Sequence, residues 1–237
     1  MQVNELYNGD CFDIMPMIPD HSIDMIMTDL PYGITTCKWD TPLDLDRLWK
    51  EYKRMLVKGG AVILSATQPF AARLIMSNPK WFRHEVIWEK DNGSNCFNVN
   101  RMPFQVHENI LVFCERGTIY NPQMTDGKAY GRIQKGSRYQ HLGPTERITT
   151  TNHGNRYPRS VQKFKRDYGK LIHPTQKPVA LYEWIIKTYS NENALILDNC
   201  AGSGTTAIAA RNYNRRWILI EKDKEIYERA RERIYKE

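Results

Sequence analysis

The stretch Ile23-Asp24-Met25-Ile26-Met27-Thr28-Asp29-Leu30-Pro31-Tyr32-Gly33 decides the fold. Its first half is an apolar run, which is typical of a strand buried on both faces of a parallel sheet. Proline and glycine then end that strand. The Asp29 carboxylate, a backbone carbonyl and the Tyr32 ring therefore follow the carboxyl end of a strand, where open α/β sheets bind ligands. Such a set suits a flat ring that carries an exocyclic amino group, such as adenine or cytosine.

Further apolar runs lie on both sides of this strand in the sequence. We expect strands at residues 3–8, 61–65, 194–198 and 217–221, and helices at residues 43–56, 69–76, 178–189, 207–212 and 226–235. Strands that alternate with helices predict an α/β fold with a mostly parallel sheet. Residues 84–89 and 109–114 also read as strands, and no helix separates them. That spacing favours antiparallel pairing between the two.

The positive charge of the chain is concentrated in one stretch. Residues 128–170 hold eleven basic and two acidic residues, an excess of nine in a chain of net charge +7, so the remainder carries −2. A stretch of this kind suits contacts with nucleic-acid phosphates, and Tyr130, Tyr139 and Tyr157 add rings that can stack on bases. The predicted DNA contacts are Lys128, Arg132, Lys135, Arg138, Arg156, Arg159, Lys163, Lys165 and Arg166.

The same region interrupts the regular pattern of strands and helices. Between Gly117 and Leu171 the periodicity fades, and the segment is too long for a plain loop in a compact domain. We therefore predict one domain made of residues 1–116 and 173–237, with an inserted segment at residues 117–172.

The cysteines and the apolar runs exclude several classes of protein. The five cysteines form no Cys-x-x-Cys pair, which argues for reduced thiols and against a disulfide framework or a metal site. No run approaches the ~18 apolar residues of a membrane span, and no signal peptide is apparent. We expect a cytoplasmic protein without a resident metal ion.

A glycine-rich turn follows the strand that ends at Asp198. Gly202-Ser203-Gly204 opens a helix, so backbone N–H groups and a close approach are available to a ligand. Glu221 lies 17 residues after Gly204, at the end of the next strand, which suits a carboxylate that accepts both ribose hydroxyls. Such a turn binds either a dinucleotide or S-adenosylmethionine. The third glycine of a dinucleotide fingerprint is absent from this sequence.

Several short motifs together resemble one enzyme family. Asp29-Leu-Pro-Tyr32 resembles the Asp-Pro-Pro-Tyr motif of the amino-group DNA methyltransferases. The segments from Leu197 to Thr206 and from His173 to Pro178 are similar to the cofactor side of the same family, and Asn8-Gly-Asp10 and Trp88-x-Lys90 also have counterparts. Their order is that of the permuted β group, which includes phage and restriction-modification adenine methyltransferases. Asn199 and Cys200 depart from the family's Pro-Phe, and Leu30 replaces its first proline.

The resemblance implies a fold and a reaction. The fold would be Rossmann-like, with a mostly parallel seven-stranded sheet, an antiparallel edge pair and the small basic insert. Residues 1–116 and 173–237 would form the catalytic methyltransferase domain, and the insert at residues 117–172 would be the target-recognition segment. The reaction would transfer a methyl group from S-adenosylmethionine directly to adenine N6 in double-stranded DNA, after the base is flipped out. The Asp29 carboxylate and the carbonyl of Leu30 or Pro31 would accept hydrogen bonds from the amino group, and Tyr32 would stack on the ring.

The resemblance also implies where the cofactor lies. Asp10 would face its adenine amino group and Glu221 its ribose. The methionine end would be lined by Asp198, Gly202, Ser203 and Gly204, with Thr175 and Lys177 nearby. Apart from the resemblance, Trp39 and Asp40 could close over the flipped base or simply pack within their own loop, and the sequence favours neither.

Alternatives remain open at this stage. Cytosine N4 is a second target for the same constellation, although the family's Asp at the first motif position favours adenine. RNA, or a glutamine side chain in a release factor, could replace DNA, and a catalytically idle DNA-binding module is an alternative from another class. We expect a bacterial or phage protein that could form a homodimer, and the sequence does not tell whether a partner nuclease exists.

Overall fold

The computed structural model describes residues 1–33, 40–134, 138–139, 143–144, 148–168, 171–173 and 175–236. The chain forms two compact units. One comprises Met1–Asn121 and Ser160–Glu237, and the other comprises Pro122–Arg159. The smaller unit is shorter than the insert predicted at residues 117–172.

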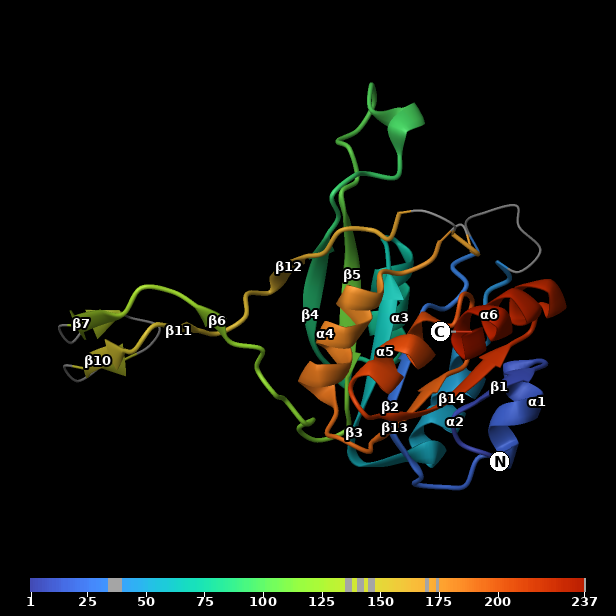
Figure 1. The fold of residues 1–237 in the computed structure, drawn as a ribbon. Helices are drawn as coiled ribbons and strands as arrows, with labels where there is room; N and C mark the ends of the chain where they lie inside the picture. The colour runs from blue at the N-terminus through green and yellow to red at the C-terminus, as the bar shows by residue number, and fades with distance from the viewer. Residues whose placement is uncertain are drawn as a thin grey trace. The chain divides into compact units, whose positions relative to one another are not determined.

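A mixed sheet forms the centre of the larger unit (Figure 1). In the described residues it has eight strands in the order β1-β14-β13-β2-β3-β5-β4-β12. Their bounds are β1 Glu5–Asn8, β2 Ile23–Thr28, β3 Leu56–Ala66, β4 Phe82–Glu89, β5 His107–Phe113, β12 Val161–Lys163, β13 Leu195–Asp198 and β14 Arg216–Glu221. β5 runs antiparallel to both of its neighbours, and the other pairs are parallel.

The predicted α/β class, with its mostly parallel sheet and antiparallel pair, is confirmed. The sheet has eight strands where seven were expected, because Val161–Lys163 pairs with Ile87–Glu89 and extends the edge. This strand was missed since it has only three residues and lies inside the basic stretch, where no apolar run marks it.

Helices cover both faces of the sheet. They are α1 Cys11–Ile14, η1 Met15–Met17, α2 Leu45–Met55, α3 Phe70–Ser77, α4 Val179–Tyr189, α5 Thr205–Asn212 and α6 Lys224–Lys236. Met25 and Met27 of β2 join the core under α4, α5 and α6, whereas Ile26 points to the core under α2 and α3. Alternate residues of a strand face opposite sides, so a strand covered on both sides must be apolar throughout. That is why the run before Asp29 lacks polar alternation.

The smaller unit is a ribbon of antiparallel pairs. β6 Thr125–Asp126 pairs with β11 Asn155–Arg156, β7 Tyr130–Gln134 with β10 Ile148–Asn152, and β8 Arg138–Tyr139 with β9 Gly143–Pro144. The β-branched run Ile148-Thr-Thr-Thr151 favours the extended backbone of β10. The Arg156 guanidinium lies 4.9 Å from the centre of the Tyr130 ring, and it also bonds to Asn152 and to the carbonyl of Lys128.

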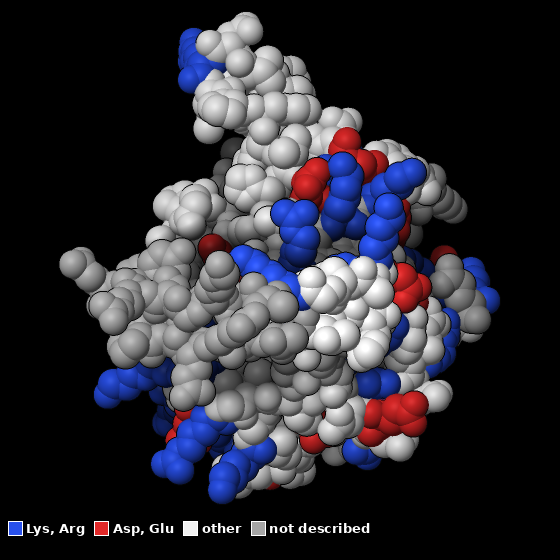
Figure 2. Space-filling view, turned by 90° about the vertical axis from the view of Figure 1, so that its left-hand side faces the viewer, with Lys and Arg blue, Asp and Glu red and all other residues white. Residues whose placement is uncertain are grey.

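The predicted DNA contacts are divided between the two units. Lys128, Arg132, Arg138, Arg156 and Arg159 belong to the ribbon, and Lys135 lies outside the described residues. Lys163 is the last residue of β12 in the larger unit, and Lys165 and Arg166 follow it. There the ammonium of Lys163 lies 3.0 Å from Glu89, and the guanidinium of Arg166 lies 3.8 Å from Asp91. Figure 2 likewise shows Lys and Arg side chains next to Asp and Glu side chains on the face that it draws.

Candidate active site

Acidic side chains meet at one edge of the sheet. β1, β14, β13 and β2 are parallel, and each has an acid at its end or within the next two residues: Asp10, Glu221, Asp198 and Asp29 respectively. β5 runs the other way, so its first residues, His107 and Glu108, lie at the same edge. The carboxyl ends of parallel strands in such sheets are the usual place for a ligand.

The Asp29 carboxylate is held on both oxygens. Tyr32 Oη donates to Asp29 Oδ1 at 2.7 Å, and Lys177 Nζ lies 2.5 Å from Asp29 Oδ2. The Tyr32 ring rests against Phe70, with 5.0 Å between ring centres. Burial, together with the negative charges of Asp29 and Glu108, raises the pKa of Tyr32, so its hydroxyl stays a neutral donor. Leu30 is buried in the core behind the motif.

The contact between Lys177 and Asp29 continues into a chain of buried charges. Lys177 Nζ lies 3.3 Å from Glu108 Oε2, and Lys90 Nζ lies 2.6 Å from Glu108 Oε1. Burial would lower the pKa of Lys177, but Asp29 and Glu108 outweigh it and raise that pKa. Burial would raise the pKa of Glu108, but Lys177 and Lys90 outweigh it and lower that pKa. Both shifts favour the charged forms of Lys177 and Glu108, so acidic and basic side chains alternate along this chain of contacts.

The structure adds a contact of Lys177 that was not predicted, because its ammonium lies on the Asp29 carboxylate. Its place near the methionine end of the cofactor stays a prediction. Glu108 was not predicted as a site residue, and Lys90 was noted only within Trp88-x-Lys90. The available signal was the pair His107-Glu108 before an apolar strand, because an antiparallel strand brings its first residues to this edge.

The glycine-rich turn lies between β13 and α5, and its two glycines serve different purposes. Both have a positive φ, 51° at Gly202 and 73° at Gly204. A Cβ built on Gly204 would lie 2.6 Å from Ile234 of α6, so this glycine permits close helix packing. A Cβ on Gly202 would meet no atom of the described residues within 4 Å, so Gly202 faces open space among them. Of the two glycines, Gly202 is therefore the one placed to let a ligand approach its backbone.

Two buried acids hold this turn. Glu221 accepts the N–H of Gly202 and the N–H of Asp223, both at 2.8 Å. Asp198 accepts the N–H of Cys200 at 3.1 Å and the hydroxyl of Thr206 at 2.5 Å. Burial raises the pKa of Glu221, and it raises the pKa of Asp198 to about 6.

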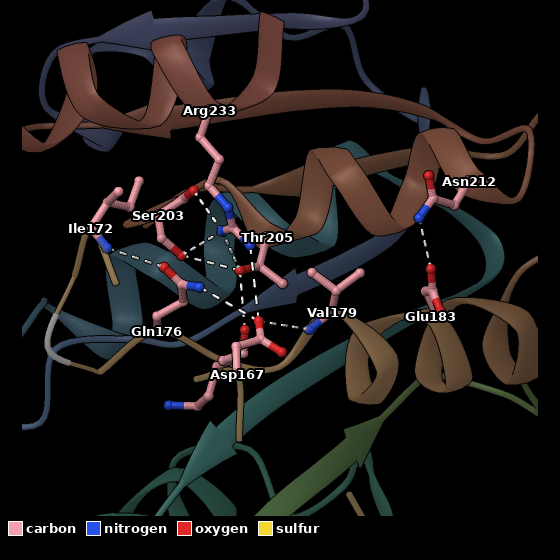
Figure 3. A network of polar contacts seen from close by, with 10 residues as sticks. Asp167, Ile172, Gln176, Val179, Glu183, Ser203, Thr205, Asn212 and Arg233 are labelled. Atoms are coloured by element: carbon pink, nitrogen blue, oxygen red, sulfur yellow. Dashed lines mark hydrogen bonds and ion pairs between the residues drawn. The ribbon is translucent and has the colours of Figure 1, made fainter. Parts of the chain in front are cut away.

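Arg233 of α6 closes the other side of the turn (Figure 3). Its guanidinium donates to the carbonyl of Ser203 at 3.0 Å, to the hydroxyl of Ser203 at 3.2 Å and to the hydroxyl of Thr205 at 3.0 Å. It also lies 3.9 Å from the carboxylate of Asp167. The Ser203 side chain is therefore turned toward Arg233, a residue that no sequence motif had pointed to.

The remaining predicted residues lie on either side of these clusters. Asp10 accepts the N–H of Phe12 at 2.9 Å and lies 2.9 Å from the ammonium of Lys222. Thr175 is exposed, and its hydroxyl lies 2.9 Å from His173 Nδ1. Asp40 accepts the N–H of Gly33 at 2.8 Å and so stabilises the turn after the motif. Trp39 lies outside the described residues.

Neither a metal site nor a membrane span is found in the described part of the chain. No group of His, Cys, Asp and Glu among these residues is arranged to hold a metal ion. Within the same residues, no helix is long and apolar enough to cross a membrane.

Solved structures share this fold. The structure of the M1.HpyAVI–SAM complex has a TM-score of 0.65 and 24% identity, over 98% of both chains. The cytosine-N4-specific PvuII DNA methyltransferase has a TM-score of 0.68 and 15% identity, over 96% of this chain and 84% of that one. The chain thus shares the α/β fold of these structures.

The family follows from the sequence match. Residues 23–232 match the N6/N4 methyltransferase family model, which is described as DNA methylase, and the chain belongs to that family. The type II methyltransferase M.HinfI of Haemophilus influenzae is 28% identical, over 98% of this chain and 68% of its own length. The protein is thus a DNA methyltransferase of the class that modifies adenine N6 or cytosine N4. The predicted family is confirmed, and with it the cofactor, S-adenosylmethionine.

Proposed function

We propose that this protein methylates adenine N6 in double-stranded DNA at a specific sequence, after flipping the adenine out of the helix. The observation that carries the proposal is the Asp29 carboxylate, held between Tyr32 and Lys177, whose ammonium also contacts Glu108. A carboxylate in a fixed position can accept a hydrogen bond from an amino group at the sheet edge.

The Asp29 carboxylate would make the amino nitrogen a better nucleophile. A hydrogen bond from the amino group to Asp29, and a second to the carbonyl of Leu30 or Pro31, draw the nitrogen lone pair out of conjugation with the ring. The nitrogen gains positive charge as the new N–C bond forms, so a nearby carboxylate stabilises the transition state more than the ground state. Tyr32, packed on Phe70, would offer its ring to the flipped base.

The residues around the glycine-rich turn suit S-adenosylmethionine. Gly202 faces open space, and Glu221 carries two oxygens that retain acceptor capacity beside their bonds to backbone N–H groups. We assign Glu221 to the ribose, Asp10 to the adenine amino group, and the backbone around Gly202 and Ser203 to the methionine end. When bound, the cofactor supplies an activated methyl group.

We assign target recognition to the predicted insert, residues 117–172, and within it chiefly to the ribbon Pro122–Arg159. Lys128, Arg132, Arg156 and Arg159 give this unit a basic character that suits phosphate contacts. Replacement of Lys128 and Arg132 by alanine should weaken DNA binding and flatten its salt dependence. The log–log slope should change by up to about 0.9 for each phosphate that is no longer neutralised. An unchanged slope would remove these residues from the interface.

Adenine is the proposed target because the first motif residue is Asp29, which in this family accompanies adenine more often than cytosine. The purine ring also offers Tyr32 a larger stacking surface, and stacking must offset the cost of unpairing.

A nucleoside analysis tests the proposal. The protein is incubated with S-adenosylmethionine and unmethylated plasmid, and the digested DNA is examined by mass spectrometry. We expect N6-methyladenine with the wild type and none with the Asp29→Ala variant, which controls for contaminating enzymes. N4-methylcytosine without N6-methyladenine would show that cytosine is the target. Methylation of matched RNA in place of DNA would overturn the choice of substrate.

A further inference from the structure

The loop between β4 and β5 exposes an unusual number of apolar side chains. Phe97, at its tip in η2 Cys96–Asn98, is 99% exposed. Val99, Met102, Phe104 and Val106 are also large apolar residues with at least a third of their surface exposed. Isolated exposed apolar residues are common, but five within ten residues of one loop are an unusual concentration, and exposed apolar surface often marks a contact site.

The loop is held in shape by its own contacts. The Asn95 side chain donates to the carbonyl of Pro103 at 3.1 Å and accepts the N–H of Gln105 at 2.7 Å. The Phe104 ring fills the space beside Gly93, where a Cβ would come within 2.6 Å of it. These contacts join the two arms of the loop and leave Phe97 at the tip without cover. The tip is thus presented in a defined shape and does not need to be ordered by its partner.

The position of the loop points to DNA as that partner. The loop projects from the edge of the sheet at which Glu108 of β5 contacts Lys177, which in turn contacts Asp29 (Figure 1, green loop at the top). A duplex that presents a base to Asp29 must lie across this edge. Residues 92–106 contain no acid, and their only charged side chain is that of Arg101, so phosphates meet no repulsion there. The same projecting part is seen at the top of Figure 2, with a Lys or Arg side chain on it.

We propose that the loop of residues 92–106 inserts Phe97 between base steps of the DNA and thereby helps to extrude the target base. Apolar side chains that enter a duplex in this way unstack the neighbouring bases. Phe97 would occupy space that the flipped base leaves, or widen the adjacent step, while Arg101 contacts a phosphate. This proposal rests on the proposed base flipping, and it adds a DNA-contacting element outside the basic insert.

The experiment compares a paired and a pre-opened target. The recognition sequence is first mapped with the wild type on plasmid DNA. Two duplexes then carry that sequence, one fully paired and one with the target base opposite an abasic site. Methylation rates are measured for the wild type, for Phe97→Ala, for Phe97→Trp, which retains a ring, and for Met76→Ala. Met76 is a matched control because it is 72% exposed on α3, near the opposite edge of the sheet, where β4 begins.

We expect Phe97→Ala to slow methylation of the paired duplex by about tenfold, as for the loss of a ring that stacks on a base. Most of this loss should disappear on the abasic duplex, where little extrusion remains to be done. Phe97→Trp and Met76→Ala should stay within about twofold of the wild type on both duplexes. Circular dichroism and light scattering check that each variant keeps its fold and molar mass.

Three results would overturn the proposal. The first is an unchanged rate for Phe97→Ala on the paired duplex. The second is an equal loss on both duplexes, which would indicate a general binding contact. The third is a drop in molar mass for Phe97→Ala, which would make the loop an interface between two copies of this chain. Failure of the wild type to methylate either duplex would instead overturn the proposed function.

Discussion

The two halves of the sheet edge are held by different kinds of contact. Around Asp29, side chains from three distant segments hold one another through charge, since Lys177 and Glu108 come from parts of the chain far from the motif. Around Gly202, acids at strand ends accept backbone N–H groups from the turn itself. The contacts around Asp29 fix the position of a carboxylate where methyl transfer would occur. The contacts around Gly202 fix the backbone conformation of a turn that the cofactor would approach.

Because of this difference, we expect substitutions around Asp29 to change turnover. We expect substitutions around Gly202 to change cofactor affinity or stability. The largest effect should come from Asp29 itself. Asp29→Asn keeps the shape of the side chain but removes its charge, so kcat should fall by about a hundredfold or more. Binding of S-adenosylmethionine, measured by calorimetry, should be nearly unchanged. A variant that retains more than a tenth of wild-type turnover would contradict the role of Asp29.

Lys177→Met should reduce kcat by about tenfold at neutral pH and make it depend on pH. Without the ammonium, Asp29 and Glu108 lose the positive charge that they share, and the loss of a nearby positive charge raises the pKa of a carboxyl group. Turnover of the variant should therefore fall further as the pH is lowered from about 8 to 6, relative to the wild type. Lys236→Met is the matched control, because Lys236 forms an exposed ion pair with Glu232. Parallel pH profiles for Lys177→Met and the wild type would show that the ion pair is merely structural.

Glu221→Ala should raise the KM for S-adenosylmethionine by about tenfold with little change in kcat. Its carboxylate would contact the ribose equally in ground and transition states, and it also holds the N–H of Gly202. Steady-state kinetics with varied cofactor measure both constants. A fall in kcat at unchanged KM would show that Glu221 acts on turnover, as Asp29 does, and not on cofactor binding.

The smallest effects separate the two glycines. Gly204→Ala should lower the free energy of unfolding by about 1–3 kcal/mol, because the added methyl group clashes with Ile234 and φ is positive. Gly202→Ala has the same backbone penalty without the clash, so it should cost about 1 kcal/mol and also weaken cofactor binding. Urea unfolding and calorimetry measure the two effects. Equal losses of stability would contradict the difference seen between the two positions.

The parts of the site that are formed by a single strand and the turn after it could be predicted from the local sequence. The strand before Asp29 and the turn at Gly202 could be predicted because apolar runs and glycines act over a few residues. The local sequence could not show that Gly204 serves helix packing whereas Gly202 faces open space. It depends on where α6 packs, and no pattern within the turn records that contact.

Patterns in the amino-acid sequence were enough to predict the α/β class, the family and the sheet edge at which Asp10, Asp29, Asp198 and Glu221 gather. Apolar runs and the acids that follow them are local properties, which appear within a few neighbouring residues of the sequence. The folded chain was needed to show that Lys177 and Glu108 hold Asp29, that Arg233 holds the turn, that Val161–Lys163 extends the sheet and that Phe97 projects from its edge. These features follow from segments far apart in the chain, whose contacts are decided by how the helices and the antiparallel strand pack on the sheet.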